Sequence, residues 1–383
     1  MAFKPPDGGA AENVFQLVRG LSEHGWELEL AGPLESPVYG RLPADVRTHR
    51  LPISPGYAAL RSNANALRGL RAVLADGSFD LIHAHSAQAG LLARFAHLAG
   101  GPQVVYTPHC FTFLDHPSPG RSFVGLTIER TLAPLTAAFI DVSAYERDSA
   151  LRAGVGTRDQ HHLVHNGSAP CLESGEPADH ALAAFRGAGP LVSVVASLRP
   201  QKRVDVFLRA APRILREVPE ARLAVIGNGD ERDRLLQLAA QLGLDRDPRL
   251  LVAPFEGPAS RYLASTDVYV LPSGWESLPI GVLEALACGV PQVATDVGGV
   301  AEAISRDTGV LVAPYSPRAL AEAVIELLRD PDRRARMGAA SRERHRAMFG
   351  LGRMVAETVG VYEHVLAGVA VAPAGGRLHN AGA

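Results

Sequence analysis

Short apolar runs rich in β-branched residues alternate with longer helical patterns along the chain. Most runs end in glycine or in polar turn residues, which is typical of buried strands in a parallel sheet. The alternation therefore predicts repeated strand–helix units. The predicted strands fall into two groups, residues 27–31, 81–85, 104–107, 138–142 and 162–165 in the first half and residues 191–196, 222–226, 250–253, 268–271, 292–295 and 310–312 in the second.

These two groups predict an α/β protein with two Rossmann-like parallel-sheet domains facing each other across a cleft. A chain of 383 residues exceeds one ordinary core, and residues 167–180 have the glycine, proline and acidic composition of a hinge. We expect domains over residues 1–170 and 171–345, a helix over 346–368 that packs back on the first domain, and a flexible tail over 369–383. Ligands of such sheets bind beyond the carboxyl ends of the strands, so the site is expected in the cleft.

Composition narrows the classes of function. The chain is 47% hydrophobic and 20% charged, with a formal net charge of -2, so it offers no global field for nucleic acid. No apolar run approaches the roughly 18 residues of a membrane span, and the start MAFKPPDGG lacks the features of a signal peptide. We expect a cytoplasmic protein, soluble or attached peripherally to the inner face of the membrane.

Cysteine and lysine are both rare. Cys110, Cys171 and Cys288 have no metal-type spacing, and any disulfide scheme leaves one of them unpaired. This fits a reduced cytoplasm, and we expect all three to be small core residues. Of the basic residues, 36 are arginine and only Lys4 and Lys202 are lysine. An ammonium is a compact charge that suits a phosphate where a guanidinium fork does not fit, so Lys202 is a candidate phosphate ligand.

The most informative stretch is WESLPIGVLEALACGVPQVATDVGG at residues 275–299. Pro279 suits the first position of a helix and Gly289 suits its C-terminal cap. Glu276 then precedes the helix and Glu284 lies in its second turn. This spacing suggests two hydrogen-bonding groups along an extended ligand, although an amphipathic helix with both glutamates in water explains the spacing equally well.

Backbone N–H groups at the start of this helix, including those of Ser277 and Leu278, favour a phosphate. Two other loops follow strands of the second half. SLRPQKR at residues 197–203 carries three cations at a helix start, and GNG at residues 227–229 lets backbone approach a ligand closely, without the third glycine of a dinucleotide fingerprint. The residue at position 255 follows the next strand and can frame a nucleobase. The candidates on these loops are Arg199, Lys202, Arg203, Gly227, Gly229 and Phe255.

The order of these features resembles the family-four glycosyltransferases, which are retaining enzymes of the two-domain GT-B fold. The resemblance covers nearly the whole chain, and its last piece contains the specific Glu-x7-Glu signature of that family. The matching pieces are GGAAENVFQLVRGLSEHGWELELAGP at 8–33, FDLIHAHSAQAGLLAR at 79–94, VVYTPHCFTF at 104–113, LVHNG at 163–167, ASLRPQKRVDVFLRA at 196–210, LAVIGNGDERDRL at 223–235 and VLPSGWESLPIGVLEALACGVPQVATDVGG at 270–299.

The resemblance implies a retaining glycosyltransferase without a metal or other cofactor. Such an enzyme moves a sugar from a nucleotide-diphosphate donor to a glycan, lipid-linked or small-molecule acceptor, in the biosynthesis of cell-surface polysaccharide or glycoconjugates. It further implies that the second domain binds the donor, with Glu284 on the ribose, Glu276 facing the transferred sugar and Lys202 neutralising the β-phosphate. A fixed ammonium and a helix N-terminus stabilise the charge of the leaving group.

In the first domain, which the resemblance assigns to the acceptor, Gly8 and Gly9 would let backbone reach the same diphosphate. His109, in TPHCF, would lie by the sugar on the acceptor side and join Lys202 and Glu276 as a catalytic candidate. A hydrogen-bonded structural histidine is the alternative for His109. The family normally has a β-strand ahead of the GG loop, whereas only MAFKPP and an aspartate precede it here. We therefore expect the first sheet to have lost or weakened a central strand.

Two departures concern the phosphate site. The family commonly has arginine five residues before its lysine, where this chain has Ser197, and glycine after the lysine, where it has Arg203. Arg199 or Arg203 would have to supply the second cation. Arg203 also restricts the backbone at a turn that glycine adopts freely.

Other polar residues have weaker signals. His83 and His85 lie on one face of a strand and more readily shape the acceptor cleft than bind a metal, since no third ligand has a defined spacing. Arg61, Arg68 and Arg71 share one helix face that would meet anionic lipid in a membrane-associated protein, or water otherwise.

Three alternatives to a glycosyltransferase stay open, namely an epimerase or a phosphorylase of the same fold and a non-catalytic protein that binds sugar nucleotides.

Overall fold

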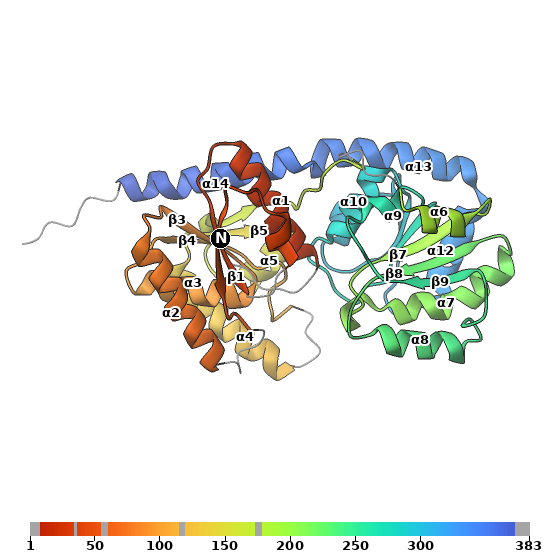
Figure 1. The fold of residues 1–383 in the computed structure, drawn as a ribbon, viewed down its shortest axis with the longest axis horizontal. Helices are drawn as coiled ribbons and strands as arrows, with labels where there is room; N and C mark the ends of the chain where they lie inside the picture. Colours follow the sequence, from red (N-terminus) through yellow and green to blue (C-terminus); the bar gives the residue numbers. More distant parts are fainter. Residues whose placement is uncertain (1–7, 34–36, 55–59, 115–118, 173–177, 372–383) are drawn as a thin grey trace, which may run out of the picture.

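Two lobes of helices packed around parallel strands make up the protein, shown by the computed structural model in Figure 1. The structure describes residues 8–33, 37–54, 60–114, 119–172 and 178–371. The predicted tail over 369–383 therefore lies outside the described residues beyond position 371. Each predicted strand is present, with ends displaced by at most two residues. The predicted α/β class with two Rossmann-like domains is confirmed.

The C-terminal lobe contains a six-stranded parallel sheet in the order β12-β11-β10-β7-β8-β9. Its strands are β7 (Leu191–Val195), β8 (Arg222–Ile226), β9 (Leu250–Ala253), β10 (Val268–Leu271), β11 (Gln292–Thr295) and β12 (Gly309–Val312). Its helices are α6 (His180–Arg186), η4 (Pro200–Lys202), α7 (Val204–Glu217), α8 (Arg232–Gln241), α9 (Ser260–Leu263), α10 (Ile280–Cys288), α11 (Val300–Ala303), α12 (Pro317–Arg329) and α13 (Pro331–Arg344).

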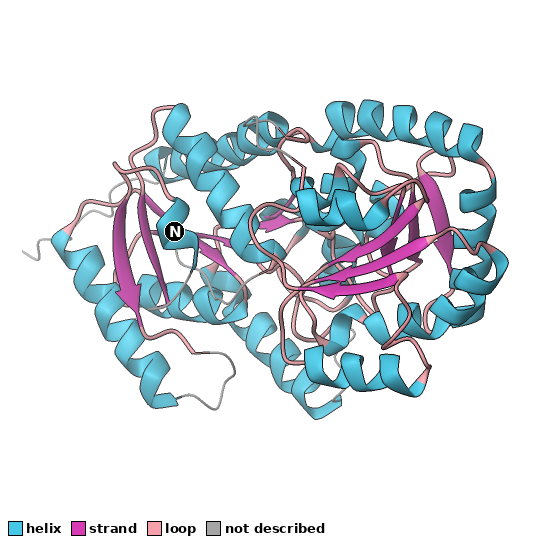
Figure 2. Ribbon diagram, turned by 45° about the vertical axis from the view of Figure 1, so that its right-hand side comes forward, coloured by secondary structure: helices cyan, strands magenta, loops and turns pink. Residues whose placement is uncertain are grey.

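Helices cover both faces of this sheet, which Figure 2 shows from a turned view. Every residue of β7 is buried, as its continuous run LVSVV predicts for a central strand. Val192 and Val194 face the core shared with α7, α8 and α12, whereas Leu191 and Val195 face the core shared with α9 and α10. The loops at the carboxyl ends of the strands consequently carry the functional candidates of this lobe.

The strands of the N-terminal lobe form two parallel sheets, β1-β2 and β3-β4-β5-β6. The strands are β1 (Glu29–Pro33), β2 (Arg47–Leu51), β3 (Leu81–His85), β4 (Gln103–Thr107), β5 (Ala138–Asp141) and β6 (His161–Leu163). The helices are α1 (Gly9–Glu23), η1 (Pro37–Arg41), α2 (Leu60–Asp76), α3 (Ala87–Leu98), α4 (Pro119–Leu132), η2 (Ala133–Leu135), α5 (Ala144–Arg152) and η3 (Arg158–Gln160).

The first sheet is divided between β1 and β3, which do not pair among the described strands. Ala31 of β1, Leu81 and Ile82 of β3, and Leu70 and Leu74 of α2 line a cavity between the two parts. Among the described strands, this division lies where we expected a lost or weakened central strand. Strand β2 was missed from the sequence, because RTHRL has no apolar run and all but its last residue are at least partly exposed.

The chain crosses between the lobes twice, and the two crossings lie side by side. Ser168 donates its backbone N–H to Phe349, and Leu351 donates to Ser168, at 2.9 and 3.2 Å. After a π-helical turn (His345–Phe349), helix α14 (Leu351–Val371) runs back along the N-terminal lobe (Figure 1). Its Val355 and Tyr362 join the core under β4 and β5. The C-terminal helix therefore belongs to the N-terminal lobe by packing.

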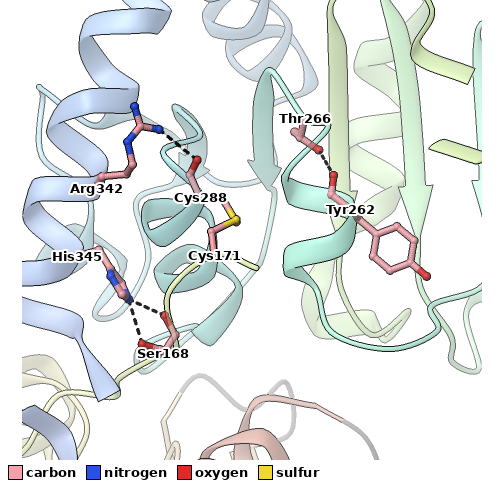
Figure 3. Close-up of a disulfide and its surroundings, with 7 residues drawn as sticks. All are labelled: Ser168, Cys171, Tyr262, Thr266, Cys288, Arg342 and His345. Carbon is pink, nitrogen blue, oxygen red and sulfur yellow. Dashed lines mark hydrogen bonds between the residues drawn. A yellow bond between two sulfur atoms is a disulfide. The ribbon is translucent and has the colours of Figure 1, made fainter. Parts of the chain in front are cut away.

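A disulfide bond joins Cys171, just after the first crossing, to Cys288 at the end of α10 (Figure 3). The expectation that all three cysteines are small core residues is wrong for these two, which are disulfide-bonded and only partly buried. Their spacing of 117 residues gave no signal in the sequence, and only the fold brings them together. Beside the bond, His345 Nε2 lies 2.9 Å from Ser168 Oγ, so the first crossing is fastened to both α10 and the π-helical turn.

Breaking this disulfide should lower the stability of the protein. The bond closes a long loop, so the unfolded chain gains entropy when it is removed. We expect Cys171→Ser to lower the free energy of unfolding in urea by about 2–4 kcal/mol. A reducing agent should bring the wild type to the stability of the variant and leave the variant unchanged. Equal stability of oxidised wild type and variant would contradict the assignment.

Candidate active site

The loop between β10 and α10, residues 272–279, lies beyond the carboxyl end of the six-stranded sheet. It packs on the glycine turn that follows β11. A Cβ on Gly298 would lie 1.7 Å from the carbonyl oxygen of Glu276, and one on Gly299 would lie 1.9 Å from that of Ser277. Only glycine permits such an approach, so this turn fixes the height of the loop above the sheet.

Helix α10 follows this loop as predicted. Pro279 is the residue before the helix rather than its first residue, and Gly289 ends the helix in the left-handed conformation with φ 70°. The backbone N–H groups of the first turn have no helical partners, so the start of α10 favours an anion. Ser277 and Leu278 are buried beside this helix start.

Lys202 of η4 and Glu276 of this loop form an ion pair. Lys202 Nζ donates to Glu276 Oε1 at 2.5 Å, and Ser273 Oγ donates to the same oxygen at 2.7 Å. The side chains of Lys202 and Glu276 are 18% and 7% exposed, so water screens the pair only partly. Gln201 Nε2 donates to the carbonyl of Trp275 at 2.8 Å and ties the two loops together. The structure thus pairs the cation predicted for the β-phosphate with the carboxylate predicted for the sugar.

The two arginines near Lys202 differ in their surroundings. Arg203 adopts the left-handed conformation with φ 46°, which explains why glycine is the usual residue of the family at this turn. Its guanidinium donates to both carboxylate oxygens of Asp205 at 2.9 Å and lies 4.6 Å from the centre of the Tyr315 ring. Arg203 is therefore engaged within its own lobe. Arg199, the residue before η4, is half-buried beside the loop.

The GNG loop packs against protein backbone. A Cβ on Gly227 would lie 2.0 Å from the carbonyl oxygen of Ala196, and one on Gly229 would lie 2.3 Å from that of Leu198. These glycines bring the loop after β8 against the loop after β7. Asn228 accepts from the backbone N–H of the next loop and donates to its carbonyl, both at position 255. The glycines thus permit a close approach to residues 196–198, and the approach of this loop to a ligand stays a prediction. The aromatic residue so held is Phe255, whose ring lies 5.7 Å from that of Tyr262.

Glu284 is half-buried in the second turn of α10, a helix that contacts α1 of the other lobe. Burial, together with the charge of Glu12, raises the pKa of its carboxyl to about 8, while Arg41 opposes the shift. Glu12 itself is held by Arg41, whose two Nη atoms donate to its carboxylate at 2.7 and 3.2 Å. A carboxyl predicted to hold a ribose is therefore placed at the boundary between the lobes.

The glycine pair at the start of α1 also lies at this boundary. A Cβ on Gly8 would lie 3.4 Å from Ser197 Oγ, and one on Gly9 would lie 3.8 Å from Ile280 at the start of α10. Gly8 has φ 144°, which L side chains rarely adopt. The structure thus brings Gly8 and Gly9 next to both donor-side loops. Ser197, where the family commonly has arginine, faces the glycine pair.

His109 lies on a strained turn after β4. Both His109 and Cys110 have positive φ, at 56° and 103°, which costs free energy for residues other than glycine. His109 Nε2 lies 2.9 Å from His85 Nδ1, so one ring donates and the other accepts. Burial lowers the pKa of His109 to about 4. The imidazole is consequently neutral at physiological pH.

His83 and His85 are fully buried at the end of β3. His83 uses one ring nitrogen with the Tyr362 hydroxyl at 2.5 Å and the other with the Thr107 hydroxyl at 2.8 Å. Burial lowers the pKa of both histidines. Among the described residues, no group of three or more His, Cys, Asp or Glu side chains is placed to bind a metal ion.

Two carboxylates were not singled out in the sequence, Glu146 in the first turn of α5 and Glu302 of α11. Glu146 is buried and accepts from the N–H of Cys110 at 2.5 Å and from Ser277 Oγ at 3.1 Å. Burial raises the pKa of Glu146 to about 7, as does the charge of Asp141. Glu302, from α11, accepts from two backbone N–H groups at the start of α5, both at 2.8 Å. Both carboxylates therefore join the two lobes.

Asn166, within the LVHNG piece, is a third link between the lobes. Its Nδ2 donates to the carbonyl of Leu278 at 2.8 Å, and its Oδ1 accepts from Asn13 of α1 at 2.9 Å. The signal available for Asn166 was its place in a matching piece beside the hinge. For Glu146 it was the SAYE pattern of a capped helix start, which predicts a local role only.

The basic face of α2 is present but lies away from these loops. Arg61, Arg68 and Arg71 are exposed on it, and its contact with lipid stays a prediction. Within the described ranges, no helix is long and apolar enough to cross a membrane.

Comparison with known proteins decides the family. The model of the glycosyl transferases group 1 matches residues 177–344, and the model of the glycosyl transferase 4-like domain matches residues 8–167. The D-inositol 3-phosphate glycosyltransferase of Thermobispora bispora is 30% identical over 76% of this chain and 72% of that protein. The chain is a group 1 glycosyltransferase. The predicted family and enzyme class are thereby confirmed.

Two further proteins illustrate the range of this glycosyltransferase family. The UDP-Gal:alpha-D-GlcNAc-diphosphoundecaprenol alpha-1,3-galactosyltransferase of Escherichia coli is 26% identical over 73% of this chain and 74% of that protein. The structure of sucrose-phosphate synthase from Thermosynechococcus elongatus superposes with a TM-score of 0.83, at 23% identity, over 96% of this chain and 99% of that one. At 23% identity, the likeness to sucrose-phosphate synthase establishes the fold alone, which is GT-B.

The raised pKa of Glu284 predicts a pH-dependent gain from its neutral isostere. The fold favours the protonated carboxyl, so the stability that Glu284 contributes is present below its ordinary pKa of 4.5 and is lost as pH rises through about 8. Glu284→Gln should therefore melt above the wild type at about pH 9 and with it at about pH 5.

Differential scanning fluorimetry across this pH range measures the effect. Glu220→Gln, which removes an exposed carboxylate from the same lobe, controls for the loss of one surface charge. A melting-temperature difference between Glu284→Gln and wild type that is the same at both pH values would contradict the buried carboxyl.

Proposed function

We propose that this glycosyltransferase takes its sugar from a nucleoside diphosphate sugar bound in the cleft, with retention of configuration and without a metal ion. The observation that carries the proposal is the pairing of Lys202 with Glu276 in front of the start of α10. The backbone of Gly8 and Gly9 lies next to Ser197 and to Ile280 at the start of α10, so the glycine pair of the other lobe adjoins the loops that carry this ammonium and the N–H groups of the helix start. Such a set of donors suits a diphosphate.

The chemistry of the leaving group assigns the main task to Lys202. The bond from the anomeric carbon to the β-phosphate oxygen breaks, and negative charge grows on the diphosphate. Lys202 Nζ, now on Glu276, would transfer its hydrogen bond to that phosphate and leave Glu276 to accept from sugar hydroxyls. Charge stabilisation of this kind is strongest where water is excluded, and both side chains are largely buried.

The acceptor hydroxyl attacks the same face of the sugar in this proposal. Its oxygen forms the new bond to the anomeric carbon, and its proton goes to the departing phosphate oxygen. His109, neutral and held by His85, would hydrogen-bond the sugar rather than exchange a proton. No covalent nucleophile is required.

The donor and acceptor are proposed from the relatives. The galactosyltransferase of Escherichia coli is named for a UDP-sugar and a lipid-linked acceptor, and the Thermobispora bispora protein for an inositol phosphate. We therefore propose a UDP-sugar as donor and a polyol, glycan or lipid-linked sugar as acceptor, in cell-surface polysaccharide or glycoconjugate biosynthesis. A thermal-shift panel of UDP-, GDP- and ADP-sugars tests the donor.

Lys202→Ala should abolish most turnover of the donor that the panel selects. Loss of one preorganised charge at a leaving group costs on the order of 100-fold or more in kcat. Release of nucleoside diphosphate measures this rate, and circular dichroism checks that the fold survives with Glu276 unpaired. Arg209→Ala, which removes an exposed cation from α7 of the same lobe, is the control and should keep the wild-type rate.

Products separate the alternatives. A new glycoside with free nucleoside diphosphate supports the proposal, whereas an altered sugar nucleotide indicates an epimerase and a sugar phosphate a phosphorylase. Binding of the sugar nucleotide with neither transfer nor slow hydrolysis of its sugar would indicate a non-catalytic protein. Wild-type turnover by Lys202→Ala would overturn the role of the ammonium.

A further inference from the structure

Glu146 is a fully buried carboxylate whose contacts reach three segments of the protein. Its Oε1 accepts from the backbone N–H of Cys110 at 2.5 Å and from Ser277 Oγ at 3.1 Å, and its Oε2 accepts from the N–H of Val142 at 3.1 Å. Ser143 Oγ accepts from the N–H of Glu146 at 3.1 Å, which fixes the start of α5 beneath it. Helix capping accounts for the bond to Ser143 and leaves the bonds to Cys110 and Ser277 unexplained.

The bond to Cys110 reaches the strained turn that carries His109. Two consecutive residues with left-handed backbone are unfavourable by about 1–3 kcal/mol each and persist only where the surroundings hold them. Glu146 holds this turn from its backbone side, while His85 holds the His109 ring from the other. The orientation of His109 thus depends on both contacts.

The bond to Ser277 reaches the donor-side loop of the other lobe. Ser277 directly follows Glu276 and precedes the start of α10, so one carboxylate oxygen contacts both lobes. Figure 1 places α5 and α10 on the facing sides of the two lobes. An oxygen shared in this way fixes the distance from the His109 turn to the Lys202–Glu276 pair.

We propose that Glu146 is a positioning residue that sets His109 against the donor loop when the lobes are together. The proposal rests on the proposed function, because it assigns Glu146 to the geometry of that reaction. Glu146 touches neither sugar nor phosphate in this role. It acts through the Cys110 N–H on one side and the Ser277 hydroxyl on the other.

Glu146→Gln tests the proposal, since an amide has a single acceptor oxygen and must lose either the two bonds of Oε1 or the bond of Oε2. Glu302→Gln is the matched control. Glu302, on the C-terminal lobe, accepts from the N–H groups of Ala144 and Tyr145 at the start of the same helix and bonds to His165 Nε2 at 2.9 Å, and none of these partners belongs to the His109 turn. It therefore reports the effect of loosening this interface alone.

The kinetic readout separates positioning from binding. We expect Glu146→Gln to lower kcat for the selected donor and acceptor by about tenfold or more while its KM for donor changes less than about threefold. Glu302→Gln should keep kcat within about twofold of wild type. Equal kcat losses in the two variants would overturn the proposal, since a general loosening of the interface would then account for both.

Imidazole carbon–proton NMR gives a readout that needs no substrate. The His109 signals, assigned by their loss in His109→Gln, should shift in Glu146→Gln and stay in place in Glu302→Gln. Unmoved His109 signals in a folded Glu146→Gln would overturn the proposal. If no nucleotide sugar binds the wild type, the proposed function fails while this test still decides whether Glu146 holds the turn. Should Glu146→Gln not fold, Glu146→Asp, with a shortened carboxylate, is expected to shift the same signals.

Discussion

The loop of residues 272–279 is the constraint on which the rest of the site depends, because both lobes hold it. From its own lobe, the glycine turn after β11 packs under it and Lys202 bonds to Glu276 in front of it. From the other lobe, Asn166 donates to the carbonyl of Leu278 and Glu146 accepts from the Ser277 hydroxyl. A loop held this way presents its helix start to the cleft without reorganisation, which is the condition for stabilising charge on a leaving group.

Much of the fold could be predicted from the sequence, because buried parallel strands appear in it as continuous apolar runs. LVSVV of β7 is such a run, and every one of its residues is buried. The misses have physical reasons. Strand β2 (Arg47–Leu51) is mostly polar and largely exposed, so it has no hydrophobic signature. The disulfide between Cys171 and Cys288 depends on the packing of the hinge against α10, which no spacing rule contains.

The sequence likewise indicated which loops carry the candidate site residues. It did not indicate which side chains those residues contact. Sequence placed Lys202 and Glu276 on different loops, and only the fold shows that they contact each other. The glycines of the GNG loop approach the backbone of residues 196–198, a packing contact that the sequence did not indicate. Glu146 lies in a polar helix start whose pattern predicts local capping, whereas its second role comes from the packing of one lobe on the other.

The most direct test of this account is a crystal structure of the protein with UDP or with the sugar nucleotide that the thermal-shift panel selects. Lys202 Nζ now lies 2.5 Å from Glu276 Oε1. The account predicts that it moves to within about 3 Å of a β-phosphate oxygen, with the diphosphate against the start of α10. A bound diphosphate with the Lys202–Glu276 pair still intact, or a diphosphate held away from this helix, would contradict it.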